Sequence, residues 1–256
     1  MLPKWKTGAM TLAQSVEAAE AANLAAIAAA GKGMEWAWLA GGVAVFAGVG
    51  APFSHAIGVG MSGGSDLETV EQFFHDRGSP CVIDLCSKAD PAAWAFIHSR
   101  GYREQERSIV MVREPGPAQP IRECLRIVPP HEMKVWTRMM LEAFSDGDPA
   151  DPAMLRQMET ACSASECWVV ERTRFLGGAA LAIHDGVGLI YADAVLPEAR
   201  GEGWQAALID ARLASARTKG CHLAAASVLP GSGSQRNYER AGFREVYRRV
   251  NLVREW

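Results

Sequence analysis

The sequence contains two similar segments of fifteen residues, one before the middle of the chain and one at its end. RGYREQERSIVMVRE occupies residues 100–114 and AGFREVYRRVNLVRE occupies residues 241–255, an offset of 241 − 100 = 141 residues. Seven of the fifteen positions are identical, namely Gly101/Gly242, Arg103/Arg244, Glu104/Glu245, Arg107/Arg248, Val112/Val253, Arg113/Arg254 and Glu114/Glu255. Domains cluster at roughly 100–150 residues, and the chain has 256. The repeat therefore predicts two domains built on one plan.

A proline-rich segment divides the two copies. PGPAQP at residues 115–120 holds three prolines in six residues, a composition typical of a linker. We expect a first domain over residues 1–114 and a second over residues 121–256.

Composition excludes several classes of protein. With 49% hydrophobic and 21% charged residues, a formal net charge of −3 and a pI near 6.1, the chain can bury a core and lacks the basic surface typical of nucleic-acid binding. The most apolar run, residues 37–53, is too short and too rich in glycine for a membrane span. The six cysteines form no CxxC pair, so we expect reduced thiols, no metal site and a cytoplasmic protein.

Helical and strand-like patterns alternate in both halves. The first half predicts helices over 12–30, 66–78 and 90–101, and strands over 35–41, 43–50, 81–86 and 103–114. The second half predicts helices over 132–144, 152–162, 203–218 and 234–242, and strands over 121–128, 166–171, 175–184, 187–197, 222–230 and a terminal pair ending near 255. This order indicates an α/β protein of the α+β type, with hairpins early in the second half and one strand–helix–strand crossover late.

The crossover contains VLPEARGEGWQAALI, residues 195–209. Here a strand enters a turn with two glycines, Gly201 and Gly203, and the turn runs directly into a helix. Backbone N–H groups at a helix N-terminus attract anions, and Arg200 adds a positive charge. The stretch therefore predicts a site for a phosphate or pyrophosphate.

This loop resembles the pyrophosphate-binding loop of the GNAT superfamily of acyl-CoA-dependent N-acetyltransferases. The family core Q/R-x-x-G-x-G/A matches residues 200–205, except that Gln205 stands where glycine or alanine is usual, which could crowd the phosphates. The resemblance implies two tandem GNAT-like domains, each a mixed, mostly antiparallel sheet flanked by helices. It implies acetyl-CoA as acyl donor, bound by Ala194, Val195, Arg200, Gly201, Glu202, Gly203, Trp204, Gln205 and Ser234. Trp204 could equally pack under the helix.

A second stretch, SQRNYERAGF at residues 234–243, is similar to the next family motif. There Tyr238 matches the tyrosine that often protonates the departing thiolate. The resemblance also implies that the strand over 187–195 parts from its parallel neighbour, so that backbone groups near Ala194 and Val195 can bond the pantetheine chain.

Attack by an amine needs a base, or a water path to one. Family members with a base on the strand before the loop carry it at the position of Leu189, which cannot act as one. Strand alternation would place Tyr191 and Asp193 on the same face as Leu189. We predict Asp193 as base or amine-orienting carboxylate, with Glu142 as the alternative.

The first half lacks these groups. At the offset of 141, the loop 200–203 falls on residues 59–62, beginning with Val59, and Tyr238 falls on Ile97. The stretch GVGMSG at residues 58–63 satisfies G-x-G-x-x-G, but APFSHAI before it is a poor strand and no helix begins within it, so a dinucleotide site is disfavoured. We interpret residues 1–114 as a degenerate copy.

The resemblance thus implies an N-acyltransferase that transfers an acetyl group from acetyl-CoA to a primary amine of a small molecule or peptide, by direct attack in a ternary complex. Tyr238 and Asp193 are its predicted catalytic residues. The alternative is a catalytically silent acyl-CoA sensor or interaction module. No nucleic-acid or membrane partner is expected, and a monomer or a homodimer is equally compatible with the sequence.

Overall fold

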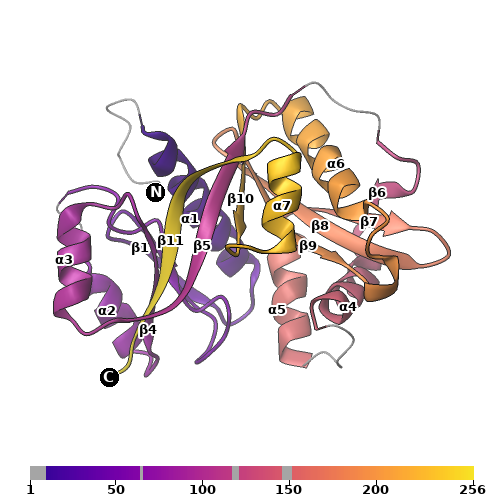
Figure 1. Ribbon diagram of the computed structural model, residues 1–256. Coiled ribbons are helices and arrows are strands. Elements are labelled where there is room, and N and C mark those ends of the chain that lie inside the picture. Colours follow the sequence, from indigo (N-terminus) through magenta and orange to yellow (C-terminus); the bar gives the residue numbers. More distant parts are fainter. Residues whose placement is uncertain (1–9, 64–65, 117–120, 146–151) are drawn as a thin grey trace. The chain divides into compact units, whose positions relative to one another are not determined.

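The computed structural model describes residues 10–63, 66–116, 121–145 and 152–256 (Figure 1). Most of the predicted linker therefore lies outside the described residues. The chain divides into two compact units, one of Met1–Val110 with Glu245–Trp256 and one of Met111–Arg244. No helix among the described residues is both long and apolar enough to cross a membrane.

The first unit is a mixed α/β fold with the strand order β1-β2-β3-β4-β11-β5. The pairs β1–β2, β2–β3 and β4–β11 are antiparallel, whereas β3 and β4 form a parallel pair in which Ala56 lies opposite Ile83. Its elements are α1 Leu12–Ala30, β1 Glu35–Leu39, β2 Gly42–Phe46, β3 Ala56–Ile57, α2 Glu68–His75, β4 Cys81–Cys86, α3 Pro91–Ser99, β5 Arg103–Arg113 and β11 Arg244–Arg254.

The last strand of the chain completes the sheet of the first unit. β11 pairs antiparallel with β4 over six positions, from Arg249 opposite Cys86 to Arg254 opposite Cys81. The repeated segments are thus β5 and β11, neighbours in one sheet. This differs from the expected domain over 121–256, because the partner of a strand is set by long-range pairing that local sequence does not encode.

Helix α1 begins at a capping box and packs on this sheet. The Thr11 hydroxyl accepts from the Gln14 N–H at 3.3 Å, and the Gln14 side chain accepts from the Thr11 N–H at 2.9 Å, which satisfies two groups that a helix end leaves unpaired. Its alanine-rich face joins a core with β2 and β3, made of Ala21, Leu24, Ala25, Ala28, Val43, Val45 and Ile57.

The second unit has the strand order β10-β9-β8-β7-β6, antiparallel except for β9 and β10. Its elements are β6 Leu125–Ile127, the 3₁₀ turn η1 Pro130–Glu132, α4 Met133–Phe144, α5 Pro152–Ser163, β7 Glu166–Glu171, β8 Phe175–His184, β9 Val187–Val195, the 3₁₀ turn η2 Pro197–Ala199, α6 Trp204–Thr218, β10 Leu223–Val228 and α7 Gly233–Arg240. Helices α4 and α6 cover opposite faces of these strands (Figure 1).

The parallel strands β9 and β10 part early. They pair only from Val187 opposite Leu223 to Leu189 opposite Ala225, although β9 continues to Val195 alongside β8. The expected opening between the two strands is therefore present, and it lies at their C-terminal ends.

The sequence prediction missed one strand. The run APFSHAI, judged a poor strand, contains β3 at Ala56–Ile57. A strand of two residues is too short to show an alternation of polar and apolar side chains. β3 forms because β2 and β4 flank it in the sheet.

Candidate active site

The turn before α6 leaves the start of the helix without a side-chain cap. Gly201 and Gly203 have φ of +85° and +78°, in the left-handed region that favours glycine. Gly203 is the N-cap residue of α6, and among the described residues the structure shows no side-chain cap hydrogen bond to the first N–H groups of this helix. Those groups, with the positive end of the helix dipole, can bind an anion.

Trp204 packs in the core beneath this turn and is 5% exposed, so it lies under the helix. Its indole N–H donates to the Glu202 carboxylate at 3.1 Å. The guanidinium groups of Arg122 and Arg172 lie 5.4 Å and 4.9 Å from the Trp204 ring centroid, and Arg172 also pairs with Glu202 at 3.5 Å. Two cations that the sequence did not single out therefore flank the turn.

Arg200 contacts the backbone. Its Nε donates to the carbonyl of Val195 at 3.1 Å, and a terminal nitrogen donates to the carbonyl of Ala143 at 3.2 Å. Arg200 thereby ties the turn to the end of β9 and to the last turn of α4.

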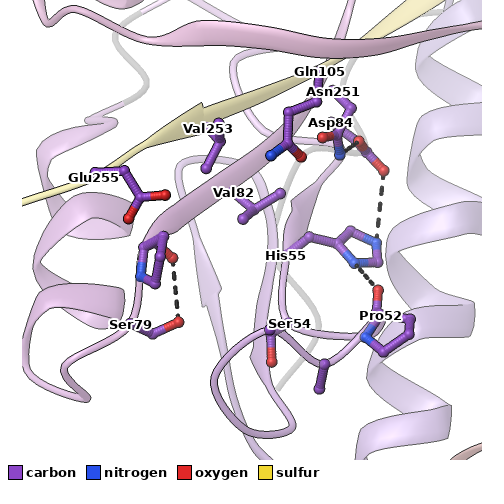
Figure 2. A pocket seen from close by; sticks show the side chains of 13 residues that line it. Pro52, Ser54, His55, Ser79, Val82, Asp84, Gln105, Asn251, Val253 and Glu255 are labelled. Atoms are coloured by element: carbon purple, nitrogen blue, oxygen red, sulfur yellow. Dashed lines mark hydrogen bonds and ion pairs between the residues drawn. The ribbon is translucent and has the colours of Figure 1, made fainter. Parts of the chain in front are cut away.

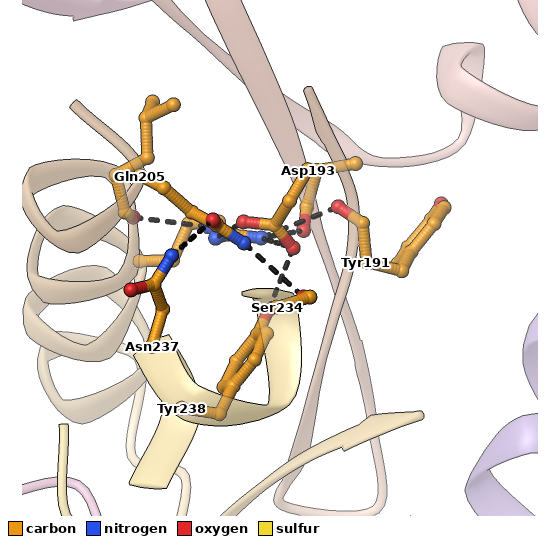
Figure 3. Close-up of polar contacts among 9 residues, drawn as sticks. Tyr191, Asp193, Gln205, Ser234, Asn237 and Tyr238 are labelled. Atoms are coloured by element: carbon orange, nitrogen blue, oxygen red, sulfur yellow. Dashed lines mark hydrogen bonds and ion pairs between the residues drawn. The ribbon is translucent and has the colours of Figure 1, made fainter. Parts of the chain in front are cut away.

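Gln205, the departure from the family pattern, bridges α6 and α7. Its Nε2 donates to the Ser234 hydroxyl at 3.1 Å, and its Oε1 accepts from Asn237 Nδ2 at 2.5 Å (Figure 3). The side chain is thus held at the first turns of both helices.

Asp193, Arg212 and Tyr238 form a buried network that joins β9, α6 and α7. Tyr238 donates its hydroxyl proton to Asp193 Oδ2 at 2.6 Å, and Arg212 donates to both carboxylate oxygens. Arg212 is fully buried and Tyr238 is 1% exposed. The structure therefore brings the two predicted catalytic residues together (Figure 3).

The network sets the protonation of its members. Burial raises the pKa of Tyr238 well above its usual value, and the negative charge of Asp193 adds to the shift. Burial opposes the charge of Arg212, but the Asp193 carboxylate outweighs this and raises the pKa of Arg212. A buried guanidinium needs a counter-ion, and Asp193 is that counter-ion.

Stability should therefore fall at alkaline pH in part through Tyr238. An unfolded tyrosine ionises near pH 10, whereas the raised pKa keeps the folded phenol protonated, so its contribution is present below about pH 10 and lost as the pH rises further. Denaturant midpoints across this range should fall less steeply in Tyr238→Phe than in the wild type. Equal slopes would show that Tyr238 titrates normally.

Asp193 reaches this network because β9 bulges. Ala192 has φ of +53°, and the register with β8 jumps from Tyr191 opposite Ala180 to Ala194 opposite Gly178. An extra residue interrupts the alternation of side chains. The Tyr191 hydroxyl instead meets the Ser165 hydroxyl at 2.5 Å, so the expectation that Tyr191 and Asp193 share a face is wrong.

The alternative base lies outside the network. Glu142 is an exposed residue of α4, and in the described part of the chain it forms no hydrogen bond or ion pair with Asp193, Arg212 or Tyr238. His184 is half-buried at the end of β8, where burial lowers its pKa.

One signal for Arg212 was readable in the sequence. Arg212 lies four residues after Leu208 and four before Ala216, on the buried stripe of a helix. A charged residue on such a stripe requires a buried partner. Arg122 and Arg172 carried no comparable signal, because they come from separate loops.

The corresponding turn of the first unit, residues 58–63, is closely packed against neighbouring elements. A Cβ on Gly58 would lie 2.9 Å from the carbonyl oxygen of Glu17, and one on Gly60 would lie 2.8 Å from the Cβ of Ala93. The N–H of Gly60 also donates to the Ala40 carbonyl at 3.0 Å. The glycines of GVGMSG therefore allow close packing, and this supports the interpretation against a dinucleotide site.

The six cysteines are reduced, and five of them are buried. Burial raises the pKa of Cys81 and of Cys86 to about 12, which disfavours the reactive thiolate.

A comparison with protein families finds a match that includes the elements of this site. Residues 133–243 match the model of the acetyltransferase (GNAT) family. A comparison with curated protein sequences gave no match. Residues 133–243 therefore form a GNAT-family acetyltransferase domain.

Solved structures show the same fold at low sequence identity. A GCN5-related N-acetyltransferase from Kribbella flavida is 18% identical, with a TM-score of 0.70 and 97% of each chain covered. One from Sphaerobacter thermophilus is 19% identical, with a TM-score of 0.57 over 83% of this chain and 72% of the other. A tandem GNAT protein from the clavulanic acid biosynthesis pathway is 14% identical, with a TM-score of 0.53 over 72% of this chain and 66% of its own.

Proposed function

We propose that the second unit transfers an acetyl group from acetyl-CoA to a primary amine of a small molecule or peptide. One observation carries this proposal. The strands β9 and β10 part after Leu189 and Ala225. Asp193 lies on β9 beyond this point and bonds Tyr238, and the uncapped start of α6 comes soon after the end of β9.

The residues present fit acetyl-CoA. The first N–H groups of α6, the turn at Gly201 and Gly203, and the nearby Arg122 and Arg172 would hold the phosphates. Backbone groups of β9 near Ala194 would bond the pantetheine amides. The bound cofactor supplies an acetyl thioester, and the parted strands direct it toward Tyr238.

Tyr238 is the proposed acid and Asp193 orients it. In the structure the Tyr238 proton is directed at Asp193, so the hydroxyl must change its partner to the departing sulfur. Asp193 is already the counter-ion of Arg212, which favours an orienting role. Water is then the proposed acceptor of the amine proton.

A catalytically silent acyl-CoA-binding module remains the second candidate. The bridge from Gln205 to Ser234 and Asn237 occupies the first turns of both helices next to the proposed phosphate site. In addition, Tyr238 donates its proton to Asp193, and a protein in which it kept that partner would bind a cofactor without protonating the thiolate.

Thiol release with a panel of primary amines separates the two candidates. Acetyl transfer predicts amine-dependent release of free CoA above the rate of hydrolysis. Stabilisation against heat by acetyl-CoA without release on any amine would favour the silent module. The absence of both would contradict both proposals.

The phosphate site can be tested with two glycines at opposite ends of one helix. Gly203 and Gly220 have φ of +78° and +79°, without close contacts for an added Cβ, so alanine should cost about 1 kcal/mol of stability at each. Only Gly203→Ala should weaken acetyl-CoA binding, measured by calorimetry, because only Gly203 lies at the N-terminus of α6. Equal affinities in the two variants would contradict the assignment.

A further inference from the structure

A cavity of about 440 Å³ lies in the first unit, and no part of the proposed acetyl transfer uses it (Figure 2). It opens where the parallel strands β3 and β4 begin, next to Pro52 and Ser79. The turn at residues 58–63 leaves the opposite end of β3. The cavity is therefore distinct from the place that corresponds to the phosphate site of the second unit.

His55 and Asp84 meet at one side of this cavity. His55 Nδ1 lies 3.1 Å from the carbonyl oxygen of Pro52, which only accepts, so Nδ1 carries a proton. His55 Nε2 faces Asp84 Oδ2 at 3.7 Å, too far for a direct hydrogen bond. The other oxygen of Asp84 accepts from Asn251 Nδ2 at 2.6 Å. With a neutral imidazole, two acceptors thus face each other across a gap.

The surroundings of the cavity are negative. Of the described residues that line it, the ionisable ones are His55, Asp84 and Glu255, and Figure 2 shows Glu255 across the pocket from His55. Asp84 and Glu255 are carboxylates, so His55 is the one ionisable residue among them that is not acidic. The remaining lining includes the apolar side chains of Val82 and Val253.

Behind Asp84 the negative charge is only partly compensated. Glu17 and Glu20 of α1 share Arg249, which lies 2.7 Å from Glu17 Oε1 and 3.6 Å from Glu20, while Glu17 Oε2 is buried without a hydrogen-bond partner among the described residues. Burial raises the pKa of Glu20, Arg249 opposes that shift, and the carboxylates of Glu17 and Asp84 add to it. A positive charge in the cavity would relieve this repulsion.

We propose that this cavity binds a small ligand through a primary ammonium group, which donates to Asp84 Oδ2 and His55 Nε2. An ammonium offers three donors and accepts none, so it fits two facing acceptors and the negative surroundings at once. Val82 and Val253 receive the carbon chain. A second ammonium at the far end of the chain can pair with Glu255.

Isothermal calorimetry on the full chain tests this site with n-pentylamine and 1,5-diaminopentane as probes. Both amines should bind, the diamine more tightly, whereas 1-pentanol and pentyltrimethylammonium, which lack the N–H donors, should not. Asp84→Asn keeps the shape of the side chain and should weaken binding by about tenfold or more, as expected for loss of a charge-assisted hydrogen bond. Asp76→Asn, an exposed carboxylate at the end of α2, should bind as the wild type does.

Two further variants locate the binding and keep the test decisive if Asp84→Asn folds poorly. His55→Gln should also weaken binding, and the ring signals of His55 should shift in nitrogen–proton NMR spectra as amine is added. Glu198→Gln, an exposed substitution in the second unit, should leave the affinity unchanged. The proposal is overturned if no amine binds below about 10 mM, or if His55→Gln and Asp84→Asn bind as tightly as the wild type.

Discussion

Replacing Tyr238 by phenylalanine is expected to lower kcat by about 100-fold or more while leaving the affinity for acetyl-CoA unchanged. General acid help is typically worth about 10²- to 10⁴-fold, and Tyr238 carries a phenol that stays protonated because burial raises its pKa. Phenylalanine keeps the edge-to-face contact with Phe243, at 5.0 Å between ring centroids. Steady-state kinetics with an accepted amine and calorimetry with acetyl-CoA measure the two quantities separately.

Tyr191→Phe is the matched control for this experiment. Tyr191 also carries a hydrogen-bonded hydroxyl near the end of β9, but it bonds Ser165 and lies away from Asp193 (Figure 3). Its kcat should stay near that of the wild type. An unchanged rate in Tyr238→Phe, or an equal loss in both variants, would rule out the acid role.

The second large effect concerns stability. Asp193→Asn should destabilise the second unit by about 3–5 kcal/mol, because it leaves the buried guanidinium of Arg212 without a counter-ion. Chemical denaturation followed by a probe in the second unit measures this loss. Glu198→Gln removes one partner of an exposed ion pair with Arg174 and should have little effect, since solvent screens such pairs.

A double-mutant cycle isolates the pair. Arg212→Met in the Asp193→Asn background removes the unpaired charge and should restore much of the lost stability. Activity should not return with it, because Tyr238 has then lost its orienting carboxylate. A double variant no more stable than Asp193→Asn would show that the loss arises from something other than the uncompensated charge.

Much of the fold was readable in the sequence because most elements carry their own local signals. Helix α1 begins after a capping threonine and ends before a glycine, and strands β4, β7 and β8 have the predicted bounds. The signals failed where long-range pairing decides. Strand β3 is too short to show alternation, and β11 pairs with β4 instead of remaining with the second half.

The site shows the same division. The glycine turn and Tyr238 were identified from motifs that lie within single segments. The bulge at Ala192 was not, because one residue in the left-handed region leaves no pattern, yet it directs Asp193 toward Arg212. Gln205 stood out as a departure, but only the fold shows that its side chain turns toward Ser234 and Asn237.

The position of β11 has a consequence for synthesis of the protein. A ribosome makes residues 111–244 before it makes the strand that pairs with β4 and supplies Arg249 and Tyr247 to the buried Glu17. The second unit is contiguous and can fold as soon as it emerges, whereas the first must wait with an open sheet edge and an uncompensated carboxylate. Domains usually fold from the N-terminus first during translation. In this chain the N-terminal unit would be the last to complete its fold.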